Sequence, residues 1–475
     1  MTTASPPPGS PQSHLGSMRA DGSRVKVHPA DVRGRWMNRR RLVFALLVAF
    51  YVLAPLVPVG GHPMIQLDVA RRSFFLFGRT FNAQDFWLVL LIALSFVFGL
   101  LFVTAWRGRV WCGWACPQTV FLEGIYRPIE RWLEGPRERR LKAAREPWTA
   151  RGVDRVVFKH VLFLAVSLAV AHTATALFVG PRELFAMVEH GPAQHRLAFG
   201  LTMGFTAVLM FNFGWFREQF CVVLCPYGRL QSVLQDRDTV SVAYDERRGE
   251  PRGKISKGAA PGSAAFGDCV DCQRCVVVCP TAIDIRNGSQ MECLACLQCA
   301  DACDEVMTRV GRPTGLIGLA SQSRLGGGTT RVLRPRLVVY GLLFLVTASA
   351  LVASLATRSS FEANVLRPRG ANPFVVDGDV VRNVFEIHLV NKAPQAADYR
   401  ITVESPVAAE IVVATPEVRL ASLTDARVPI AVALERALIG ATPIELVVVI
   451  EARASGETRR QPVRFLAPPG AAPKR

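Results

Sequence analysis

The chain has 475 residues, enough for several domains, and half of them are hydrophobic. Its formal net charge of +18 suits either a nucleic-acid-binding protein or a membrane protein whose basic residues gather on one side. The distribution of the basic residues decides between these classes, and it excludes nucleic acid as the reason for the charge.

Residues 1–35 are rich in Pro, Ser and Gly, which predicts a disordered tail. Beyond the tail, five apolar stretches reach the length of about 20 residues that crosses a bilayer. They are Leu42–Gly60, Phe86–Ala105, Val161–Gly180, Leu197–Phe216 and Leu337–Ala356. The first is longer than the core of a signal peptide and lacks a cleavage site, so we expect an uncleaved anchor. The loop at 61–85 is expected to be short and hydrated, and the charged residues expected to keep it so are Asp68, Arg71, Arg72 and Asp85.

Basic residues alternate in number between the segments that join these stretches. Lys and Arg number eight in 1–41, three in 61–85, eleven in 106–155, two in 181–196 and sixteen in 217–336. The positive-inside rule therefore predicts that the N-terminus and the two long loops are cytoplasmic and that the chain after Ala356 lies outside the cytoplasm.

A repeated motif ends two of the predicted spans at the cytoplasmic side. One copy reads Trp111-Cys112-Gly113-Trp114-Ala115-Cys116-Pro117, and the other reads Phe220-Cys221-Val222-Val223-Leu224-Cys225-Pro226. Both contain C-x3-C-P, and positions i and i+4 share one face of a helix, so each pair presents two thiols together. Two such helix ends side by side would bring four thiols to one place.

The four cysteines of this repeat are predicted to form one functional site, the alternative being four inert buried residues. They are Cys112, Cys116, Cys221 and Cys225. The site would bind soft Cu(I), hold a further cluster or cycle as a redox dithiol. Positive charge lowers the pKa of a thiol, and four arginines near the motifs are expected to do so: Arg107, Arg109, Arg217 and Arg229.

The segment Cys269–Cys303 carries the C-x2-C-x2-C-x3-C spacing of a bacterial two-cluster ferredoxin twice, and in that arrangement the fourth Cys of each run ligates the other cluster. The predicted ligands of one [4Fe–4S] cluster are Cys269, Cys272, Cys275 and Cys303. Those of the second are Cys293, Cys296, Cys299 and Cys279. Structural zinc would favour two C-x2-C pairs, and disulfides would not suit a reducing compartment.

Three other segments give weaker signals. Apolar residues recur every three or four positions from Phe121 to Leu133 among basic ones, which predicts a helix on the inner membrane surface or packed on the ferredoxin unit. Residues 241–267 and 326–328 are predicted linkers. His160 and His172 lie about 18 Å apart along one helix, so they cannot share a haem iron and are expected to be hydrogen-bonded bundle residues.

From Ser359 onward the hydrophobic pattern changes to period two. The predicted strands include 384–391, 399–403 and 444–450. Several short strands in about 115 residues suit a β-sandwich of immunoglobulin type. All 12 cysteines precede this segment, as expected if it lies outside the cytoplasm.

These motifs together resemble the cytochrome c oxidase accessory protein family, the CcoG/FixG/RdxA-type membrane polyferredoxins. The resemblance covers about residues 35–475, and residues 383–392 look like the family's C-terminal immunoglobulin-like domain. Four stretches are the most specific. They are Cys112–Val120, Arg217–Tyr227, Arg248–Gly253 and the Cys269–Cys303 run. It implies a protein of the bacterial inner membrane that helps to assemble a cbb-type haem–copper oxidase and is associated with reduction of Cu(II) to Cu(I).

The expected fold is therefore a multi-domain membrane protein with an α-helical bundle of five transmembrane helices, a cytoplasmic two-cluster ferredoxin unit and a periplasmic immunoglobulin-like β-sandwich. The predicted parts are a tail (1–35), a four-span domain (36–240), a linker and ferredoxin domain (241–325), a linker and fifth helix (326–358) and the sandwich (359–475).

Three functional hypotheses follow. In the first the protein is a cupric reductase, with the four thiols of the C-x3-C-P repeat as its catalytic residues and with oxidase subunits or copper-delivery proteins as partners. In the second it carries electrons from quinol to a periplasmic partner. In the third it is a non-catalytic assembly scaffold. The sequence contains no flavin or nicotinamide fingerprint, so the electron donor is an external protein or membrane carrier.

Overall fold

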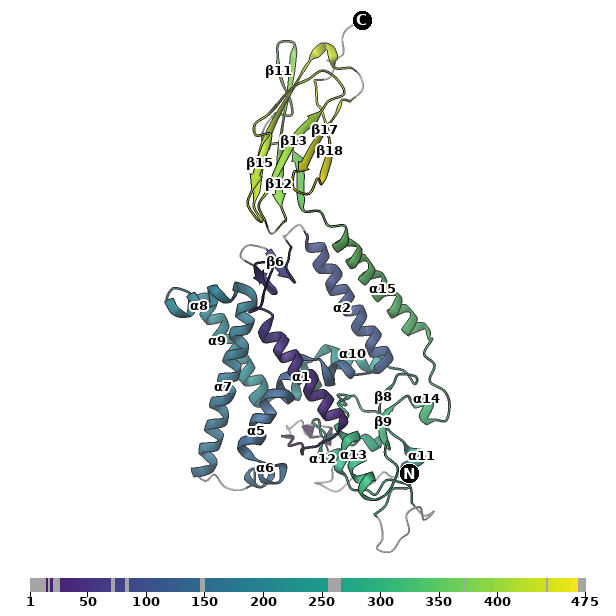
Figure 1. Ribbon diagram of the computed structural model, residues 1–475. Helices are drawn as coiled ribbons and strands as arrows, with labels where there is room; N and C mark the ends of the chain where they lie inside the picture. The colour runs from purple at the N-terminus through teal and green to yellow at the C-terminus, as the bar shows by residue number, and fades with distance from the viewer. Residues whose placement is uncertain are drawn as a thin grey trace. The chain divides into compact units, whose positions relative to one another are not determined.

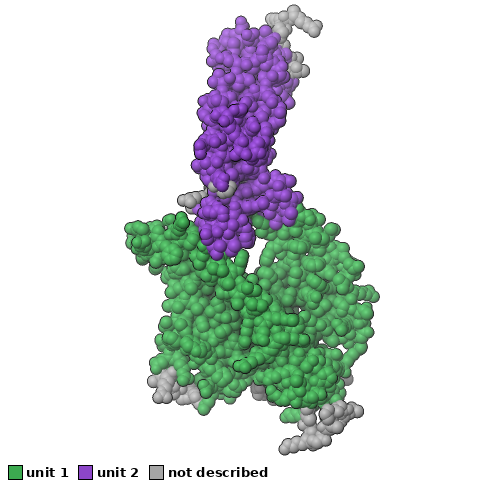
Figure 2. All heavy atoms as spheres, viewed as in Figure 1, with its two compact units in different colours: residues 1–56, 89–350 green, residues 57–88, 351–475 purple. Residues whose placement is uncertain are grey.

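The computed structural model describes residues 14–15, 18–19, 26–69, 73–81, 85–145, 150–254, 266–368, 370, 372–393, 395–440 and 443–468. The chain divides into two compact units, coloured green and purple in Figure 2. Unit 1 comprises residues 1–56 and 89–350, and unit 2 comprises residues 57–88 and 351–475. All twelve cysteines lie in unit 1.

Four of the five predicted apolar stretches form helices that are long and apolar enough to cross a membrane. They are α2 (Phe86–Arg107), α7 (Ala150–Val179), α9 (Arg196–Phe211) with its π-helical extension η4 (Asn212–Phe216), and α15 (Pro335–Ala356) (Figure 1). Large apolar side chains such as Leu90, Leu164 and Leu342 are exposed on them. An apolar exposed surface on long helices is expected where lipid replaces water.

The first predicted span, 42–60, differs from the structure. Helix α1 (Arg35–Leu53) begins with basic residues, so only its part after Leu42 is apolar, and the chain leaves the helix at Ala54. Among the described residues, α1 is therefore not one of the helices that satisfy the length and composition of a span. A fifth span stays a prediction.

Residues 26–34 pack against the cysteine-rich part of unit 1 before α1 begins. Val27, Ala30 and Val32 are buried, and the backbone N–H of Ala30 donates to the carbonyl of Val277 over 3.0 Å. This packing differs from the disordered tail predicted for residues 1–35. Upstream, the short strands β1 (His14–Leu15) and β2 (Met18–Arg19) pair with each other, and the rest of the predicted tail lies outside the described residues.

Short helices connect the long ones. Those after α2 are α3 (Val110–Trp114), α4 (Pro117–Phe121), η3 (Leu122–Tyr126), α5 (Arg127–Glu134) and α6 (Arg137–Ala143). Helix α8 (Pro181–His190) joins α7 to α9, and η5 (Phe220–Leu224) and α10 (Pro226–Leu234) follow η4. Arg127 and Glu130 of α5 are buried, so the predicted amphipathic segment turns charged side chains inward instead of toward water.

The cysteine-rich segment of unit 1 is closed by an antiparallel pair of strands, β8 (Ser241–Tyr244) and β9 (Ile317–Ala320). Its helices are α11 (Glu246–Gly249), α12 (Arg274–Val277), η6 (Ile285–Asn287), α13 (Gln298–Arg309) and α14 (Gln322–Leu325). Val242 and Tyr244 are buried in the same apolar core as Met307 and Leu316. Residues 241–254 are thus part of a folded body and not the predicted linker, while 255–265 lie outside the described residues.

Most of unit 2 is a sandwich of two antiparallel sheets, with strand orders β10-β12-β16-β14 and β15-β13-β17-β18, and β11 pairs with β12. The strands are β10 (Phe361–Leu366), β11 (Val375–Asp377), β12 (Val380–Asn391), β13 (Ala397–Glu404), β14 (Glu410–Val413), β15 (Glu417–Leu420), β16 (Asp425–Glu435), β17 (Glu445–Ala452) and β18 (Thr458–Arg464). The predicted immunoglobulin-like sandwich is confirmed, and its alternating inward residues, such as Phe385, Ile387 and Leu389, form the core.

The segment 57–88 is more ordered than the predicted wet loop. It contains the pair β3 (Pro58–Val59) and β4 (His62–Pro63) and a sheet of β5 (Ile65–Asp68), β6 (Ser73–Leu76) and β7 (Arg79–Phe81). Asp85 is buried and forms ion pairs with Arg358 at 2.7 Å and Lys392 at 3.2 Å.

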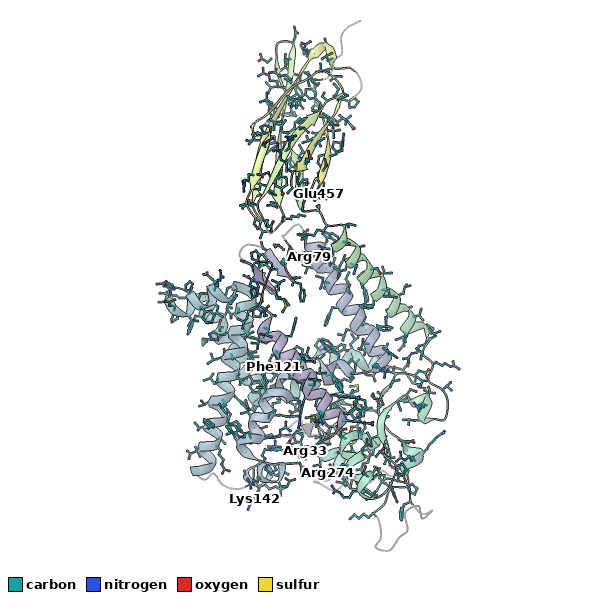
Figure 3. All side chains as sticks on the ribbon, viewed as in Figure 1. Arg33, Arg79, Phe121, Lys142, Arg274 and Glu457 are labelled. Atoms are coloured by element: carbon teal, nitrogen blue, oxygen red, sulfur yellow. The ribbon has the colours of Figure 1, made fainter. Side chains whose placement is uncertain are left out.

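A second contact fixes the start of the sandwich. Glu457, labelled in Figure 3, accepts hydrogen bonds from the backbone N–H and the hydroxyl of Ser360.

Candidate metal centre

The two cysteine runs of unit 1 have the same unusual backbone at equivalent places. Asp271 and Gln273 of the first run have φ of +50° and +55°, and Ala295 and Leu297 of the second have +52° and +61°. Left-handed residues of this kind are costly for side chains other than Gly, and they turn the chain sharply. Each run then enters a helix, α12 or α13; Arg274, labelled in Figure 3, begins α12.

The first group of thiols combines three cysteines of the first run with the last cysteine of the second. Burial raises the pKa of Cys303 to about 12, and the largest charge effects on it come from Cys275, Cys272 and Cys269. Cys269, Cys275 and Cys303 are buried, whereas Cys272 is exposed. Residues 269 and 303 are distant in sequence, so it is the fold that brings them together.

The second group combines the other four cysteines of the two runs. Burial raises the pKa of Cys299 well above its ordinary value, and the neighbouring thiols that add to the rise are, in order, Cys296, Cys293 and Cys279. Cys275 of the first group also acts on Cys299, so the two groups are neighbours. The spacing of the sequence predicts this same division into groups of four.

The donor chemistry fits iron–sulfur clusters better than zinc or disulfides. All twelve cysteines are free. Among the residues that the structure describes, no three His, Cys, Asp or Glu side chains are placed to hold a single metal ion. Structural zinc needs four ligands at about 2.0–2.3 Å from one point, whereas the thiolates of a cubane each bind a different iron atom and stand farther apart.

The four cysteines of the C-x3-C-P repeat form a third group. Burial raises the pKa of Cys221 to about 12, Cys116, Cys112 and Cys225 add to the rise, and Arg109 opposes it. Burial likewise raises the pKa of Cys116, with Cys112 the next cause. Arg109 lowers the pKa of Cys221, in the expected direction, but burial and the neighbouring thiols outweigh it and the pKa rises. The causes that lower the pKa of Cys116 are backbone hydrogen bonds from Gln118 and Thr119, and burial again outweighs them.

Both copies of the repeat use the same local device to place their second cysteine. Cys116 and Cys225 are extended residues that precede α4 and α10, and each of these helices begins with a proline. Proline suits the first position of a helix because its fixed φ is already helical. The buried side chain of Gln231 in α10 donates to the Sγ of Cys112 over 3.2 Å, so the second copy also contacts the first.

Buried ion pairs hold the second copy against the helices that follow the first. Arg217 donates to both carboxylate oxygens of Glu130, at 3.1 and 2.9 Å, and Arg127 pairs with Glu123 and with Glu218. Arg217 has a φ of +51°, a strained conformation that such contacts can maintain. The side chain of Gln118 adds a hydrogen bond to the carbonyl of Arg217 over 3.0 Å.

Family models match three parts of the chain. A 4Fe-4S dicluster domain covers residues 216–322, a 4Fe-4S binding domain covers residues 88–136, and an IG-like fold found at the C-terminal of FixG covers residues 351–468. The dicluster model contains both cysteine runs and the second copy of the C-x3-C-P repeat. The 4Fe-4S binding model at 88–136 contains the first copy.

Relatives share most of the chain. Protein RdxB of Cereibacter sphaeroides is 36% identical over 83% of this chain and 85% of its own, and nitrogen fixation protein FixG of Rhizobium meliloti is 33% identical over 82% and 81%. The chain belongs to the FixG/RdxA family. It is thus an iron–sulfur electron-transfer protein with 4Fe–4S domains, apolar helices of membrane-spanning length and an immunoglobulin-like domain.

One solved structure, of a FixG-related protein from Vibrio parahaemolyticus, aligns with 23% of this chain and 97% of its own at 15% identity. The TM-score of this alignment is 0.21, too low to compare the two folds.

Sequence reasoning missed two residues of this FixG/RdxA-type site, Gly113 and Gln231, and it predicted the influence of Arg109 only on the C-x3-C-P thiols and not on Cys293. A glycine inside a C-x3-C-P motif is the one signal that was available, because glycine often marks a close approach of two backbones. His160 and His172 each hydrogen-bond a carbonyl of their own helix through Nδ1, at 2.7 and 2.8 Å. Both histidines are distant in sequence from the three thiol groups. Among the contacts of the described residues, neither histidine touches one of these groups.

Proposed function

We propose that the eight cysteines of the two runs ligate two [4Fe–4S] clusters. Cys269, Cys272, Cys275 and Cys303 would hold one, and Cys279, Cys293, Cys296 and Cys299 the other. The support is the electrostatic grouping of the thiols into the same two sets. Such clusters supply one-electron storage and transfer, while the protein fixes their spacing and surroundings.

The acceptor in this proposal is Cu(II), which is reduced to Cu(I) at the four thiols Cys112, Cys116, Cys221 and Cys225. The observation that carries it is the convergence of the two motifs on one place beside the second cysteine group. Thiolates are soft ligands and stabilise Cu(I) over Cu(II), so they favour reduction as well as binding. Reduced copper would then serve assembly of a cbb-type oxidase, the role that the family resemblance implies.

A further cluster at the same four thiols is the second candidate. The observation in its favour is that the 4Fe-4S binding domain model matches residues 88–136, which include Cys112 and Cys116. Metal counting separates the candidates: two clusters give about eight iron atoms per chain and three give about twelve. Copper binding by protein that contains eight irons supports the first candidate.

The proposed topology places unit 1's cysteine-rich segment in the cytoplasm and the sandwich in the periplasm, with α1 as a fifth membrane segment. Its support is the alternation of basic residues between loops. A reporter that is active only in the cytoplasm should be active when fused after Arg140 or Arg252. A reporter that is active only in the periplasm should be active when fused after Arg475. A cytoplasmic readout at Arg475 contradicts the five-span topology.

The test of function uses protein purified without oxygen, with iron and copper counted and the clusters observed by EPR. After reduction by dithionite, the protein is mixed in a stopped-flow instrument with Cu(II) or with a quinone. Reoxidation by Cu(II), with one Cu(I) formed per electron, is the expected result. Reoxidation by quinone alone supports the quinol-linked carrier, and reoxidation by neither supports a scaffold.

A further inference from the structure

The first C-x3-C-P motif touches the second cysteine run backbone to backbone. A Cβ atom placed on Gly113 would lie 2.3 Å from the carbonyl oxygen of Leu294 and 3.1 Å from the carbonyl carbon of Ala295. Only glycine allows this approach, because the atoms that it meets are backbone and cannot move aside cheaply. Beside it, the indole Nε1 of Trp114 donates to the carbonyl of Ala295 over 3.2 Å.

The contact joins residues that lie directly between predicted metal ligands. Gly113 and Trp114 stand between Cys112 and Cys116, and Leu294 and Ala295 stand between Cys293 and Cys296. Electrons cross proteins most readily through short paths of packed and bonded atoms. This contact is such a path between the second cysteine group and the four thiols.

Two buried arginines lie at the same junction. Arg40 is fully buried, donates from Nε to the carbonyl of Gly113 over 2.7 Å, and is the charged group with the largest effect on the pKa of Cys296, which it lowers. Arg109 is 7% exposed, and its charge acts on both Cys293 and Cys221. Metal-bound thiolates carry negative charge on both sides of the junction, and nearby positive charge favours the thiolate form.

Of the twelve free cysteines, one is exposed, and it belongs to the first cysteine group. Its Cys272 is exposed to solvent, while its Cys275 neighbours Cys299 of the second group. The first group therefore presents a thiol to solvent and adjoins the second, and the second adjoins the C-x3-C-P site through the backbone contact just described.

We propose that electrons enter unit 1 at the first cysteine group, pass to the second, and leave through the contact between Leu294 and Gly113 to the four thiols. This inference rests on the proposed function, which supplies the ligand sets and the acceptor. Each passage moves one electron and neither forms nor breaks a bond. The external one-electron donor is dithionite in the test, and each electron that leaves converts one Cu(II) to Cu(I).

The kinetic test compares Gly113→Ala with Val222→Ala, which changes the equivalent position of the second motif. Both variants should keep the iron content and both EPR signals of the wild type. The two signals are assigned with Cys272→Ser and Cys296→Ser. In freeze-quenched wild type, Cu(II) should oxidise the centre lost in Cys296→Ser first. Gly113→Ala should slow this step several-fold, because the added methyl group separates the two backbones, and Val222→Ala should not.

A second readout does not depend on copper. With Cys112, Cys221 and Cys225 replaced by serine, a spin label on Cys116 should broaden the EPR signal of the second centre more than that of the first. Equal or reversed broadening, earlier oxidation of the first centre, or a Gly113→Ala rate equal to the wild type overturns the inference. If the broadening is as expected but Cu(II) leaves the wild type reduced, the proposed function fails and the order of the sites stands.

Discussion

The two copies of the C-x3-C-P repeat have the same spacing but different surroundings. In the first copy, Gly113 and Trp114 contact the second cysteine run. In the second copy the corresponding part is a π-helix, η5, whose Val223 and Leu224 are 44% and 62% exposed. The first copy therefore faces the metal-binding segment, and the second is positioned from its other side by the ion pairs of Arg217 and Glu218.

This difference shows how a sequence repeat becomes an asymmetric site. Each copy contributes two thiols and a proline-initiated helix, but one copy provides the contact with the ferredoxin segment and the other depends on α5 for its position. We expect the free-energy effect of a substitution to be largest at the buried ion pairs, smaller at the hydrogen bond that links the two copies, and smallest at the exposed side chains.

The largest effect is expected from Glu130→Gln. Glu130 is almost fully buried, and its loss leaves the buried guanidinium of Arg217 without its carboxylate, whereas Lys159 keeps its ion pair with Glu134. Breaking a buried pair on one side costs about 3–5 kcal/mol. Chemical unfolding in detergent should show a loss of this size, whereas the exposed Glu138→Gln in α6 should change stability by less than about 0.5 kcal/mol.

The same carboxylate predicts a pH dependence. Burial tends to raise the pKa of Glu130, but Arg217 and other cations outweigh burial and lower it from 4.5 to about 2. A depressed pKa stabilises the fold above pH 4.5 and loses that contribution as pH falls toward 2. The stability gap between wild type and Glu130→Gln should be constant near neutral pH and narrow below pH 4.5; a gap that widens in acid contradicts this assignment.

A smaller effect is expected from Gln231→Leu, which removes the hydrogen bond that joins α10 to Cys112. Hydrogen bonds to charged acceptors contribute about 1.5–3 kcal/mol. Affinity of the four thiols for Cu(I), measured by competition with a chelator, should fall about tenfold or more. Ser232→Ala, an exposed neighbour, is the control, and an unchanged affinity in Gln231→Leu means that Cys112 does not bind the metal as a thiolate.

The smallest effect is expected from Val223→Ala. Its side chain is 44% exposed, so truncation removes few contacts and should change the free energy of unfolding by less than about 0.5 kcal/mol. Trp114→Ala, at the equivalent position of the first copy, should cost more because Trp114 packs against the core of the cysteine-rich segment. Equal losses in both variants, measured by chemical unfolding, would show that the two copies have similar surroundings.

Much of the architecture follows from local patterns in the sequence. Hydrophobic length predicts four of the long helices, period-two alternation predicts strands such as β12, and cysteine spacing predicts the two thiol groups. Each signal is carried by neighbouring residues. The strand β8 was missed because four residues carry too little periodicity, and its partner β9 lies more than 70 positions away.

The site could be predicted only in outline, because its details depend on tertiary contacts. Arg217 lies close to Cys221 in sequence, but its guanidinium pairs with Glu130, and the arginine that opposes the raised pKa of Cys221 is Arg109. The approach of Gly113 to Leu294 joins segments about 180 positions apart. The burial of Asp85 likewise depends on cations from the distant sandwich segment.

The most direct test of the central claim, that cluster electrons reduce copper at the four thiols, is stopped-flow mixing of dithionite-reduced protein with Cu(II). Three variants are compared: Cys112→Ser, Cys225→Ser and the double variant. All should keep about eight iron atoms and both EPR signals. Each single variant should lose cupric reduction as fully as the double, because either change destroys the same site. A double variant that reduces Cu(II) at the wild-type rate would show that copper meets the electrons elsewhere.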